Sequence, residues 1–430
     1  MKLICALGFG VAVVASAATV PAPRTFSKDV APIIQARCQG CHRPGEAAPM
    51  SFGSYQEVRP WAKAIRGAVL TKKMPPWFAD AKYGHFANDM SLSKAEIDTI
   101  VSWVDAGAPE GNAKDLPPAR TYLTGWNIAK PDLVLEMPEA FDVPANGTVD
   151  YQYVILPYKF TEDRWVQAAE VRPGARSVVH HVIAFIREPG SKWMRDKQPG
   201  VVFVPEVNSK GEREGIAGDM LSGFAPGVPA STLPLGRGRL IKAGSDIVFQ
   251  LHYTTNGKAQ KDLTKVGVVF CKEPPAQRVM VMGASNHRFT IPAGDSNYRV
   301  DAEFELGHDV QITSLLPHMH LRGKDFEYRI IYPNGESETL LSVPRYDFNW
   351  QLWYDPVKEI AVPKGAKIAC TAHYDNSVNN ASNPDATKAV KWGDQSWEEM
   401  MIGFFDVTFD AKMDPKLLFP ERKKTTTTGE

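Results

Sequence analysis

Residues 177–186 read Ser-Val-Val-His-His-Val-Ile-Ala-Phe-Ile, an apolar run that carries two adjacent histidines. A short run of this composition is typical of a buried β-strand. Eight further runs show the same apolar, β-branched and aromatic character: residues 151–158, 246–253, 265–270, 298–304, 309–316, 326–332, 366–374 and 402–409. The chain from about residue 130 onward is therefore predicted to be all-β.

The length of this β region indicates more than one domain. Residues 130–412 exceed one ordinary β-sandwich, so two sandwiches in tandem are expected. We place them at residues 130–277 and 278–412, with the boundary at the Pro-rich stretch 273–277. Asn334-Gly335 lies between two strand-like runs and predicts a hairpin. Residues 413–430, with four consecutive threonines, are expected to form a tail.

The preceding segment, residues 25–112, has helical periodicity instead. Its clearest helix is predicted at residues 93–106, where Ser93 and Glu96 form a capping-box pattern and Gly107 ends the run. Earlier helices are expected within residues 29–36 and 55–70. Residues 113–129 are expected to link this small all-α domain to the β region.

Composition excludes several classes of protein. The 430 residues include 49 basic and 49 acidic side chains, with 43% hydrophobic residues. This composition is too apolar for a disordered chain. A net charge of zero without a long basic run argues against nucleic acid or an anionic membrane as the main partner.

The first residues have the pattern of a signal peptide, predicted at residues 1–17. Lys2 precedes an apolar run over residues 3–14, and Ala15-Ser16-Ala17 offers a cleavage site. The run is too short to span a bilayer, and no later segment is long and apolar enough to do so. We therefore expect export to the periplasm or the medium, with no membrane span.

The most specific local motif is Cys38-Gln-Gly-Cys41-His42. Two thiols at this spacing can bond covalently to haem, and the adjacent His42 can then bind the iron. The alternatives are a disulfide or half of a zinc site. Zinc would require a second pair of ligands nearby, and only His85 is available. One covalently bound haem c is therefore expected.

The second axial ligand of this haem has four candidates, namely Met50, Met74, His85 and Met90. The segment resembles the class I cytochrome c domains of exported bacterial multidomain proteins. In those domains the distal methionine commonly lies in a Met-Pro-Pro run before the last helix, and Met74-Pro75-Pro76 matches this run. The resemblance therefore implies Met74 as the ligand.

Histidines also cluster on the predicted strands. His180 and His181 are adjacent, and because side chains alternate along a strand, a plain core would not accommodate both. His252 lies on another predicted strand, within Phe-Gln-Leu-His-Tyr. His318 and His320 are separated by one residue, so their imidazoles lie on one face of a strand and can chelate one metal ion.

The order of these motifs resembles the ascorbate-dependent type II copper monooxygenases, the family of dopamine β-monooxygenase and peptidylglycine α-hydroxylating monooxygenase. The resemblance covers residues 130–412 at low overall identity and includes the run Glu398-Glu399-Met400. It implies two jelly-roll sandwiches facing each other across a solvent-filled cleft, with one copper in each. The implied ligands are His180, His181 and His252 for the first, electron-donating copper, and His318, His320 and Met400 for the second, which binds oxygen. The neighbouring Met401 stays open as an alternative to Met400.

Three departures from the family concern the substrate. The peptide-hydroxylating branch has an Arg two residues before its His-x-His, where this chain has Leu316. Its Asn and Tyr beyond the methionine correspond here to Ile402 and Phe404. A less polar substrate than a peptide carboxylate is therefore expected. Whether Cys271 and Cys370 pair is open, and His373 has no counterpart in the family.

Together these features predict a multidomain, exported haem c–copper monooxygenase: a small cytochrome c domain followed by two tandem all-β jelly-roll sandwiches. Electrons from ascorbate or a redox protein would pass through the haem to the first copper and then to the second, where O2 would oxidise a small organic substrate. One alternative is a single-metal cupin-like enzyme that uses His318, His320, Asp325 and His373. The other is a non-catalytic electron carrier or binding module.

Overall fold

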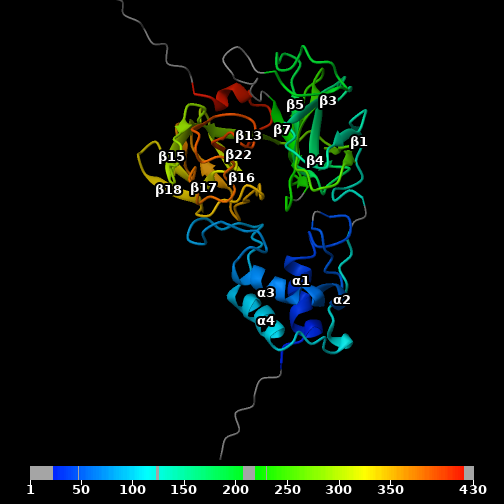
Figure 1. The fold of residues 1–430 in the computed structure, drawn as a ribbon. Coiled ribbons are helices and arrows are strands. Elements are labelled where there is room, and N and C mark those ends of the chain that lie inside the picture. Colours follow the sequence, from blue (N-terminus) through cyan, green and yellow to red (C-terminus); the bar gives the residue numbers. More distant parts are fainter. Residues whose placement is uncertain (1–22, 47, 123–124, 207–217, 229, 421–430) are drawn as a thin grey trace, which may run out of the picture.

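The computed structural model describes residues 23–46, 48–122, 125–206, 218–228 and 230–420 (Figure 1). The predicted signal peptide at residues 1–17 and the end of the predicted tail, residues 421–430, lie outside the described residues. Every helix in the described ranges is too short or too polar to cross a bilayer.

The N-terminal part is a small helical unit. Its helices are η1 (Phe26–Val30), α1 (Ala31–Arg37), α2 (Tyr55–Val58), η2 (Arg59–Trp61), α3 (Ala62–Leu70), α4 (Lys94–Asp105) and η3 (Ala113–Asp115). The predicted capping box of α4 is confirmed, because Ser93 accepts from the Glu96 backbone N–H while the Glu96 side chain accepts from the Ser93 backbone. Trp103 and Ile100 of α4 are fully buried and pack with Ile34 of α1 in the core of this unit.

The first sandwich follows the helical unit. Its strands are β1 (Leu133–Glu136), β2 (Phe141–Val143), β3 (Gln152–Ile155), β4 (Arg164–Arg172), β5 (Val179–Arg187), β6 (Val202–Phe203), β7 (Asp219–Phe224), β8 (Ser231–Thr232), β9 (Arg237–Ile241), β10 (Asp246–Tyr253), β11 (Gln260–Asp262) and β12 (Lys265–Phe270). A five-stranded sheet in the order β6-β3-β10-β5-β7 packs against β1-β12-β4-β9. Every residue of β10 is buried, which explains its nearly continuous apolar sequence.

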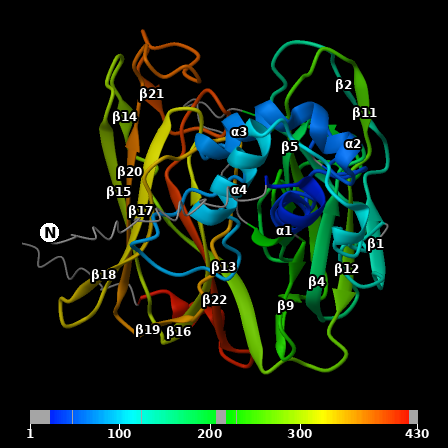
Figure 2. The ribbon, with the colours of Figure 1, turned by 90° about the horizontal axis from the view of Figure 1, so that it is seen from below.

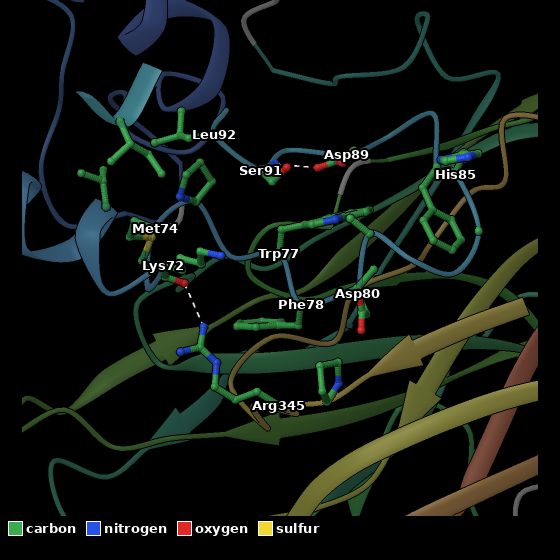
Figure 3. Close-up of a pocket in the computed structure, with 18 residues that line it drawn as sticks. Lys72, Met74, Trp77, Phe78, Asp80, His85, Asp89, Ser91, Leu92 and Arg345 are labelled. Carbon is green, nitrogen blue, oxygen red and sulfur yellow. Dashed lines mark hydrogen bonds between the residues drawn. The ribbon is translucent and has the colours of Figure 1, made fainter. Parts of the chain in front are cut away.

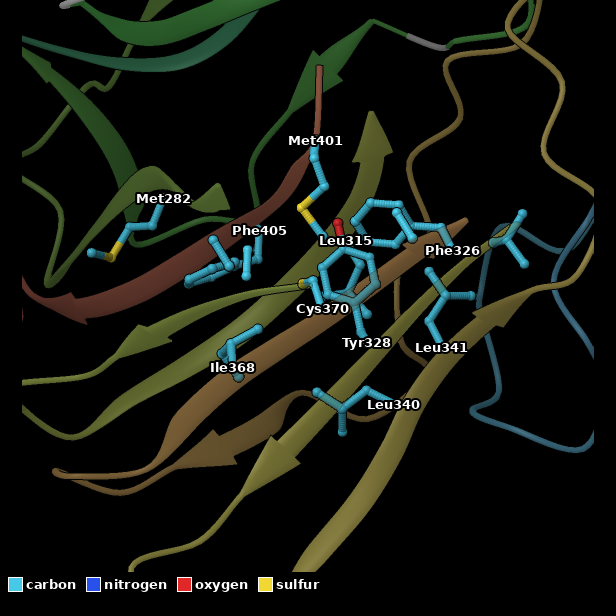
Figure 4. Packing of buried hydrophobic residues seen from close by; sticks show 14 of the residues in the cluster. Met282, Leu315, Phe326, Tyr328, Leu340, Leu341, Ile368, Cys370, Met401 and Phe405 are labelled. Carbon is cyan, nitrogen blue, oxygen red and sulfur yellow. The ribbon is translucent and has the colours of Figure 1, made fainter. Parts of the chain in front are cut away.

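The second sandwich has strands β13 (Gln277–Ser285), β14 (Thr290–Ile291), β15 (Tyr298–Glu305), β16 (Val310–His318), β17 (Gly323–Ile331), β18 (Ser337–Val343), β19 (Ile360–Val362), β20 (Lys367–Tyr374), β21 (Val390–Lys391) and β22 (Ile402–Asp410), followed by η4 (Pro415–Leu418). The sheet β15-β20-β17-β18 packs against β13-β22-β16-β19. Leu315, Tyr328, Cys370, Met401 and Phe405 meet in the core between them (Figure 4). The predicted Asn334-Gly335 hairpin is confirmed, since it joins β17 to β18 and Gly335 has a φ of 87°.

The two sandwiches are joined through a shared sheet. β13 begins at the predicted boundary and pairs in parallel with β9 over only two positions, Gln277 with Arg237 and Arg278 with Gly238. One nine-stranded sheet therefore runs through both halves. A buried ion pair between Arg239 of β9 and Asp406 of β22 crosses the same junction at 2.6 Å. The prediction of tandem β-sandwiches is confirmed, and each of the nine predicted runs contains a strand.

The helical unit is docked on one end of both sandwiches, and in Figure 2 its helices lie in front of them. The loop between α3 and α4 reaches the second sandwich, where the Asp80 N–H donates to Ser342 O at 2.8 Å and the Ala87 N–H donates to Asp355 O at 2.7 Å. On the first sandwich, Arg176 forms a salt bridge with Glu46 of the helical unit. The helical unit is thus fixed to both sandwiches by backbone and charged contacts.

Candidate metal centres

Three histidines meet where β5 and β10 pair. His181 lies directly opposite His252, whereas the next pair in register is Val179 with Tyr253. His180 is therefore the extra residue of a β-bulge, and a bulge can re-aim a side chain that would otherwise point to the opposite face. This explains how adjacent histidines serve one site: one ring nitrogen from each of His180, His181 and His252 lies within 4.8 Å of the others.

The ring nitrogens of His181 and His252 have the pattern of metal ligands. Nε2 of His181 lies 3.3 Å from the Tyr151 hydroxyl, and Nε2 of His252 lies 3.0 Å from the Ser396 hydroxyl. The Nδ1 atoms of both rings are buried without a hydrogen-bond partner, as are both ring nitrogens of His180. A metal-binding imidazole typically has one nitrogen held by the protein and the other directed at the metal. The open nitrogens therefore fit a three-imidazole metal site.

Burial keeps these imidazoles neutral, which is the form that binds metal. It lowers the pKa of His180 to about 4, with a further contribution from His318. It also lowers the pKa of His181 and His252 well below the usual value, and here the neighbouring histidines contribute as well.

A second pair lies at the end of β16. His318 is its last residue and His320 follows in the next turn, with ring centroids 5.2 Å apart. Nδ1 of His318 lies 3.0 Å from Gln351 Oε1, and Nδ1 of His320 donates to Glu398 O at 3.2 Å. Nε2 of His320 is buried without a partner. Burial lowers the pKa of His320 to about 3.

The two methionines of the Glu-Glu-Met-Met run differ in their surroundings. Met401 is fully buried in the core of the second sandwich (Figure 4). Met400 is 4% exposed but is not part of that core cluster. Its carbonyl accepts from the Tyr374 hydroxyl at 2.7 Å, which holds its backbone just before β22, the strand that pairs with β16 at His318. Met401 is therefore part of the core, and Met400 stays the candidate for a third ligand beside His318 and His320.

Glu399 connects the methionine to the histidine pair. Its carboxylate accepts from the backbone N–H groups of His320 at 2.9 Å and Arg322 at 2.6 Å. Arg322 in turn donates to Trp397 O at 2.9 Å. Burial raises the pKa of Glu399 to about 8. The hydrogen bonds from the backbone and the charge of Arg322 act in the opposite direction, but burial is the larger effect. Glu399 thus ties the segment that carries Met400 to the turn that carries His320.

One aromatic ring lies between the two histidine sets. Phe348 stacks on His180 with ring centroids 4.6 Å apart, and its ring also lies 6.1 Å from His252 and 5.9 Å from His320. The family resemblance implies a solvent-filled cleft between the two sites. Here the space between His180 and His320 holds the Phe348 ring, and His181, His252 and His320 are all buried.

The Cys-x-x-Cys-His motif follows α1. Cys38 is the C-cap of this helix, and Cys38 and Cys41 are free thiols. His42 stacks on Phe52 with centroids 4.3 Å apart, and its Nδ1 donates to Met50 O at 3.2 Å. This bond orients the ring and leaves Nε2 as the nitrogen for an iron. Because the Met50 carbonyl is bound to the His42 ring, Met50 lies beside His42. It is therefore a poor candidate for the second iron ligand.

A cavity of about 590 Å³ lies between the helical unit and the second sandwich (Figure 3). It is lined by Met74 with apolar side chains that include Val69, Leu92 and Ile97. Leu92 and Ile97 also pack against the hydrophobic core of the helical unit, as does Cys38. His85 lines it too, but it is exposed, and Met90 is not among the lining residues. Cys38, Cys41 and His42 are not among the lining residues of this cavity, so the two free thiols and the oriented imidazole are the features that fit a haem c.

The residues of the cupin-like alternative are not assembled. His373 Nδ1 lies 2.7 Å from Asp325 Oδ1, so these two residues bind each other across β20 and β17. Within the described ranges, His180, His181 and His252 are the only group of three or more histidine, cysteine or acidic residues with such closely placed ligand atoms. Cys271 and Cys370 are both free thiols, and Cys370 is buried in the second core.

Several residues that hold the sites were not predicted from the sequence: Tyr151, Phe348, Gln351 and Ser396. Ser396 belongs to the Glu-Glu-Met neighbourhood, so its place in the motif offered a signal. Phe348 and Gln351 lie between strands in a stretch without periodicity, and Tyr151 reads as an ordinary strand aromatic.

Comparison with known proteins identifies no family. No family model and no curated protein matches the sequence. Among solved structures, a subviral particle of infectious bursal disease virus VP2 is similar over 67% of this chain and 74% of that chain, at 11% identity and a TM-score of 0.18. The Gt strain of the same virus gives 10% identity and a TM-score of 0.15, over 70% of this chain and 77% of that chain. Likeness at this level carries no functional information.

Proposed function

We propose that this chain is an exported haem c–copper monooxygenase that hydroxylates a C–H bond of a small organic molecule. The observation that carries the proposal is the state of the buried imidazoles. His181, His252 and His320 each have one ring nitrogen held by the protein and the other buried without a partner. Because an unpartnered buried polar atom costs free energy, such a set supports metal binding by these imidazoles.

The ligand sets suit copper. His180, His181 and His252 would hold one ion, and His318, His320 and Met400 would hold the other, since imidazole suits copper and a thioether favours Cu(I). Cys38 and Cys41 would attach the haem, and His42 and Met74 would bind its iron. When bound, these groups would supply one-electron transfer and O2 chemistry that places one oxygen atom in the substrate and releases the other as water.

The protein supplies a dry and apolar setting for this chemistry. Leu316 and Ile402 flank His318 on β16 and β22 and are buried, and Phe404 lies with its ring centroid 6.0 Å from that of His318. These apolar side chains favour a substrate without a carboxylate. The jelly-roll type of sandwich, the external electron donor (ascorbate or a redox protein) and export through the N-terminal signal belong to the same proposal.

The test is a metal count on purified holoprotein, with His181→Ala and His318→Ala beside the wild type. We expect two coppers and one iron per chain, with one copper lost in each variant and the iron retained in both. O2 uptake with ascorbate is then measured across substrate classes. A single bound metal, or copper that is indifferent to both substitutions, would refute the proposal. If the protein binds two coppers but takes up no O2 with any substrate, the result would favour the alternative of a non-catalytic electron carrier.

A further inference from the structure

One buried amide outside the sequence motifs and the ligand sets holds the ring of His318. Gln351 lies in the stretch between β18 and β19 and is 7% exposed. Its Oε1 atom lies 3.0 Å from Nδ1 of His318, and its Nε2 atom donates to Phe348 O at 2.9 Å and to the Tyr346 hydroxyl at 3.1 Å. Both polar atoms of the amide therefore have partners, and these partners fix which way the amide faces.

Two oxygens set the orientation of the Gln351 amide. Phe348 O is a backbone carbonyl, which can only accept, so the amide nitrogen faces it. The Tyr346 hydroxyl donates its single proton to Met319 O at 2.8 Å, so this hydroxyl can only accept from Gln351. A reversed amide would place its oxygen against both acceptors and lose both hydrogen bonds.

The orientation of Gln351 determines which nitrogen of His318 carries the proton. A neutral imidazole has one N–H group and one nitrogen with a lone pair, and an amide oxygen can only accept. Nδ1 of His318 is therefore the protonated nitrogen, which leaves the lone pair of Nε2 for a metal ion. Without the amide oxygen, the ring is free to carry its proton on Nε2 and then offers no lone pair there.

His320, the other histidine of the pair, is held in a different way. Its Nδ1 atom donates to Glu398 O, a backbone carbonyl that no side-chain substitution removes. The tautomer of His320 is thus set by the main chain, whereas the tautomer of His318 depends on the side chain of Gln351. The two ligands can therefore be separated experimentally.

We propose that Gln351 is a positioning residue of the His318–His320–Met400 site, which keeps the proton of His318 on Nδ1 and thereby presents Nε2 to the metal. Gln351 acts through His318 alone. The inference rests on the proposed function for the metal itself, but the position of the proton is a property of the metal-free protein as well. Removal of the amide should weaken metal binding because the ring must first change its tautomer.

The first test uses metal-free protein with isotope-labelled histidine. Long-range proton–nitrogen correlation spectra distinguish the two neutral tautomers, and the His318→Ala and His320→Ala proteins identify the signals of these two rings. We expect the Nδ1–H form of His318 in the wild type and its loss in Gln351→Leu, where Nδ1 has no acceptor. The His320 signals should keep their wild-type pattern in Gln351→Leu, which shows that the surrounding fold is intact.

The second test measures Cu(I) affinity with a competing chelator. Gln351→Leu should weaken the binding of one equivalent by about 10- to 100-fold, the usual effect of losing the partner of a ligand. Gln351→Glu keeps an acceptor for Nδ1–H and should bind copper with nearly wild-type affinity, although a carboxylate beside Phe348 O lowers the stability of the fold. A merely structural role would instead weaken binding in both variants.

The control is Gln277→Leu. It removes an amide oxygen that accepts from Arg237 at 2.8 Å, and Gln277 pairs with the opposite end of β22 from the end that pairs with His318. Both the His318 tautomer and the Cu(I) affinity should stay at their wild-type values in this variant.

A wild-type His318 that carries its proton on Nε2 would overturn the inference. A Gln351→Leu protein that keeps either the wild-type tautomer or the wild-type affinity would do the same, as would equal losses of affinity in Gln351→Leu and Gln351→Glu. A wild-type protein that binds no copper contradicts the proposed function instead, and the spectra of the metal-free protein still decide where the proton of His318 lies.

Discussion

His181 and His252 face each other directly across β5 and β10, and the bulge beside them turns His180 to the same side. The same two strands are fixed at their other end by Arg187 and Asp246, which are also register partners and form a bidentate salt bridge. The three-imidazole site is thus built on one strand pair whose register is set at both ends. Substitutions at the histidine end should therefore change metal binding, whereas substitutions at the Arg187–Asp246 end should change the stability of the fold.

His180 should cost the metal-free protein stability. Both of its ring nitrogens are buried without a partner, and relieving such groups is worth about 1–3 kcal/mol. We expect His180→Leu to raise the free energy of unfolding of metal-free protein by about this amount and to lose the part of the copper-dependent stability that comes from the His180, His181 and His252 site. Urea unfolding with and without copper measures both effects.

The control for this substitution is His308→Leu, at an exposed turn before β16. It should leave both the metal-free stability and the gain from copper unchanged. If His180→Leu still gains stability from copper to the wild-type extent, His180 is not a ligand.

The Arg187–Asp246 pair should be costly to break from one side. Both side chains are almost completely buried, and Arg187 also donates to Trp193 O and Met194 O. Removal of Arg187 leaves the buried Asp246 carboxylate with only Arg195, a half-buried side chain 3.5 Å away, so Arg187→Met should lower the free energy of unfolding by about 3 kcal/mol. Denaturant unfolding measures this loss. Lys261→Ala, which breaks the exposed Lys261–Asp142 pair, should cost less than about 1 kcal/mol.

Sequence patterns located strands with a regular succession of apolar residues. They missed strands such as β4, in which polar residues interrupt that succession. β4 contains Arg164, Gln167 and Glu170, which interrupt the apolar pattern, and Glu170 is nevertheless buried because it binds Asn127 and Arg172. Strict alternation also places His180 and His181 on opposite faces. Only the register with β10 reveals the bulge, and register is a property of the strand pair rather than of either sequence.

The candidate site was predictable where ligands follow local spacing. His318 and His320 share a face by spacing alone, and the structure brings them together. The residues that hold the rings come from distant segments: Gln351 reaches His318, and Ser396 reaches His252 across 144 positions. The role of His373 was also not predictable from local spacing. Its partner Asp325 lies next to it only because β20 pairs with β17. Such contacts depend on tertiary packing that no local pattern encodes.

Met400 and Met401 should separate cleanly by substitution with leucine. Both are buried, and a Met-to-Leu change of similar volume costs less than about 1.5 kcal/mol. We expect Met400→Leu to weaken the binding of one Cu(I) equivalent, because the thioether is lost, while Met401→Leu keeps wild-type affinity. Titration with a competing Cu(I) chelator measures this. The opposite result would assign the ligand to Met401.

Met74 should control the electronic state of the haem iron. It lines the cavity, whereas Met50 holds His42 through its carbonyl. Met74→Ala should abolish the sulfur-to-iron charge-transfer band of the ferric protein while covalent haem is retained. Met50→Leu keeps the carbonyl and should keep the band. Loss of the band in Met50→Leu but not in Met74→Ala would contradict this assignment.

Asp219 at the junction of the sandwiches should make stability depend on pH. Burial raises the pKa of this carboxyl from 3.8 to about 6, with a smaller contribution from Asp406, although Arg239, Arg278 and a bond from the Val281 N–H lower it. The folded protein therefore holds the proton more tightly than the unfolded chain does. Stability from this group is fully present below about pH 4 and is lost as pH rises through about 6.

Asp219→Asn removes this dependence. At about 1.4 kcal/mol per pH unit, the rise from 3.8 to about 6 corresponds to about 3 kcal/mol. The variant should therefore unfold less readily than the wild type at pH 8 by an amount of this order, and equally readily at pH 4. Thermal unfolding at both pH values measures the difference, with Glu305→Gln at an exposed position as the control. A variant that is destabilised at pH 8 would show that the charged form of Asp219, facing Arg239 and Arg278, stabilises the junction.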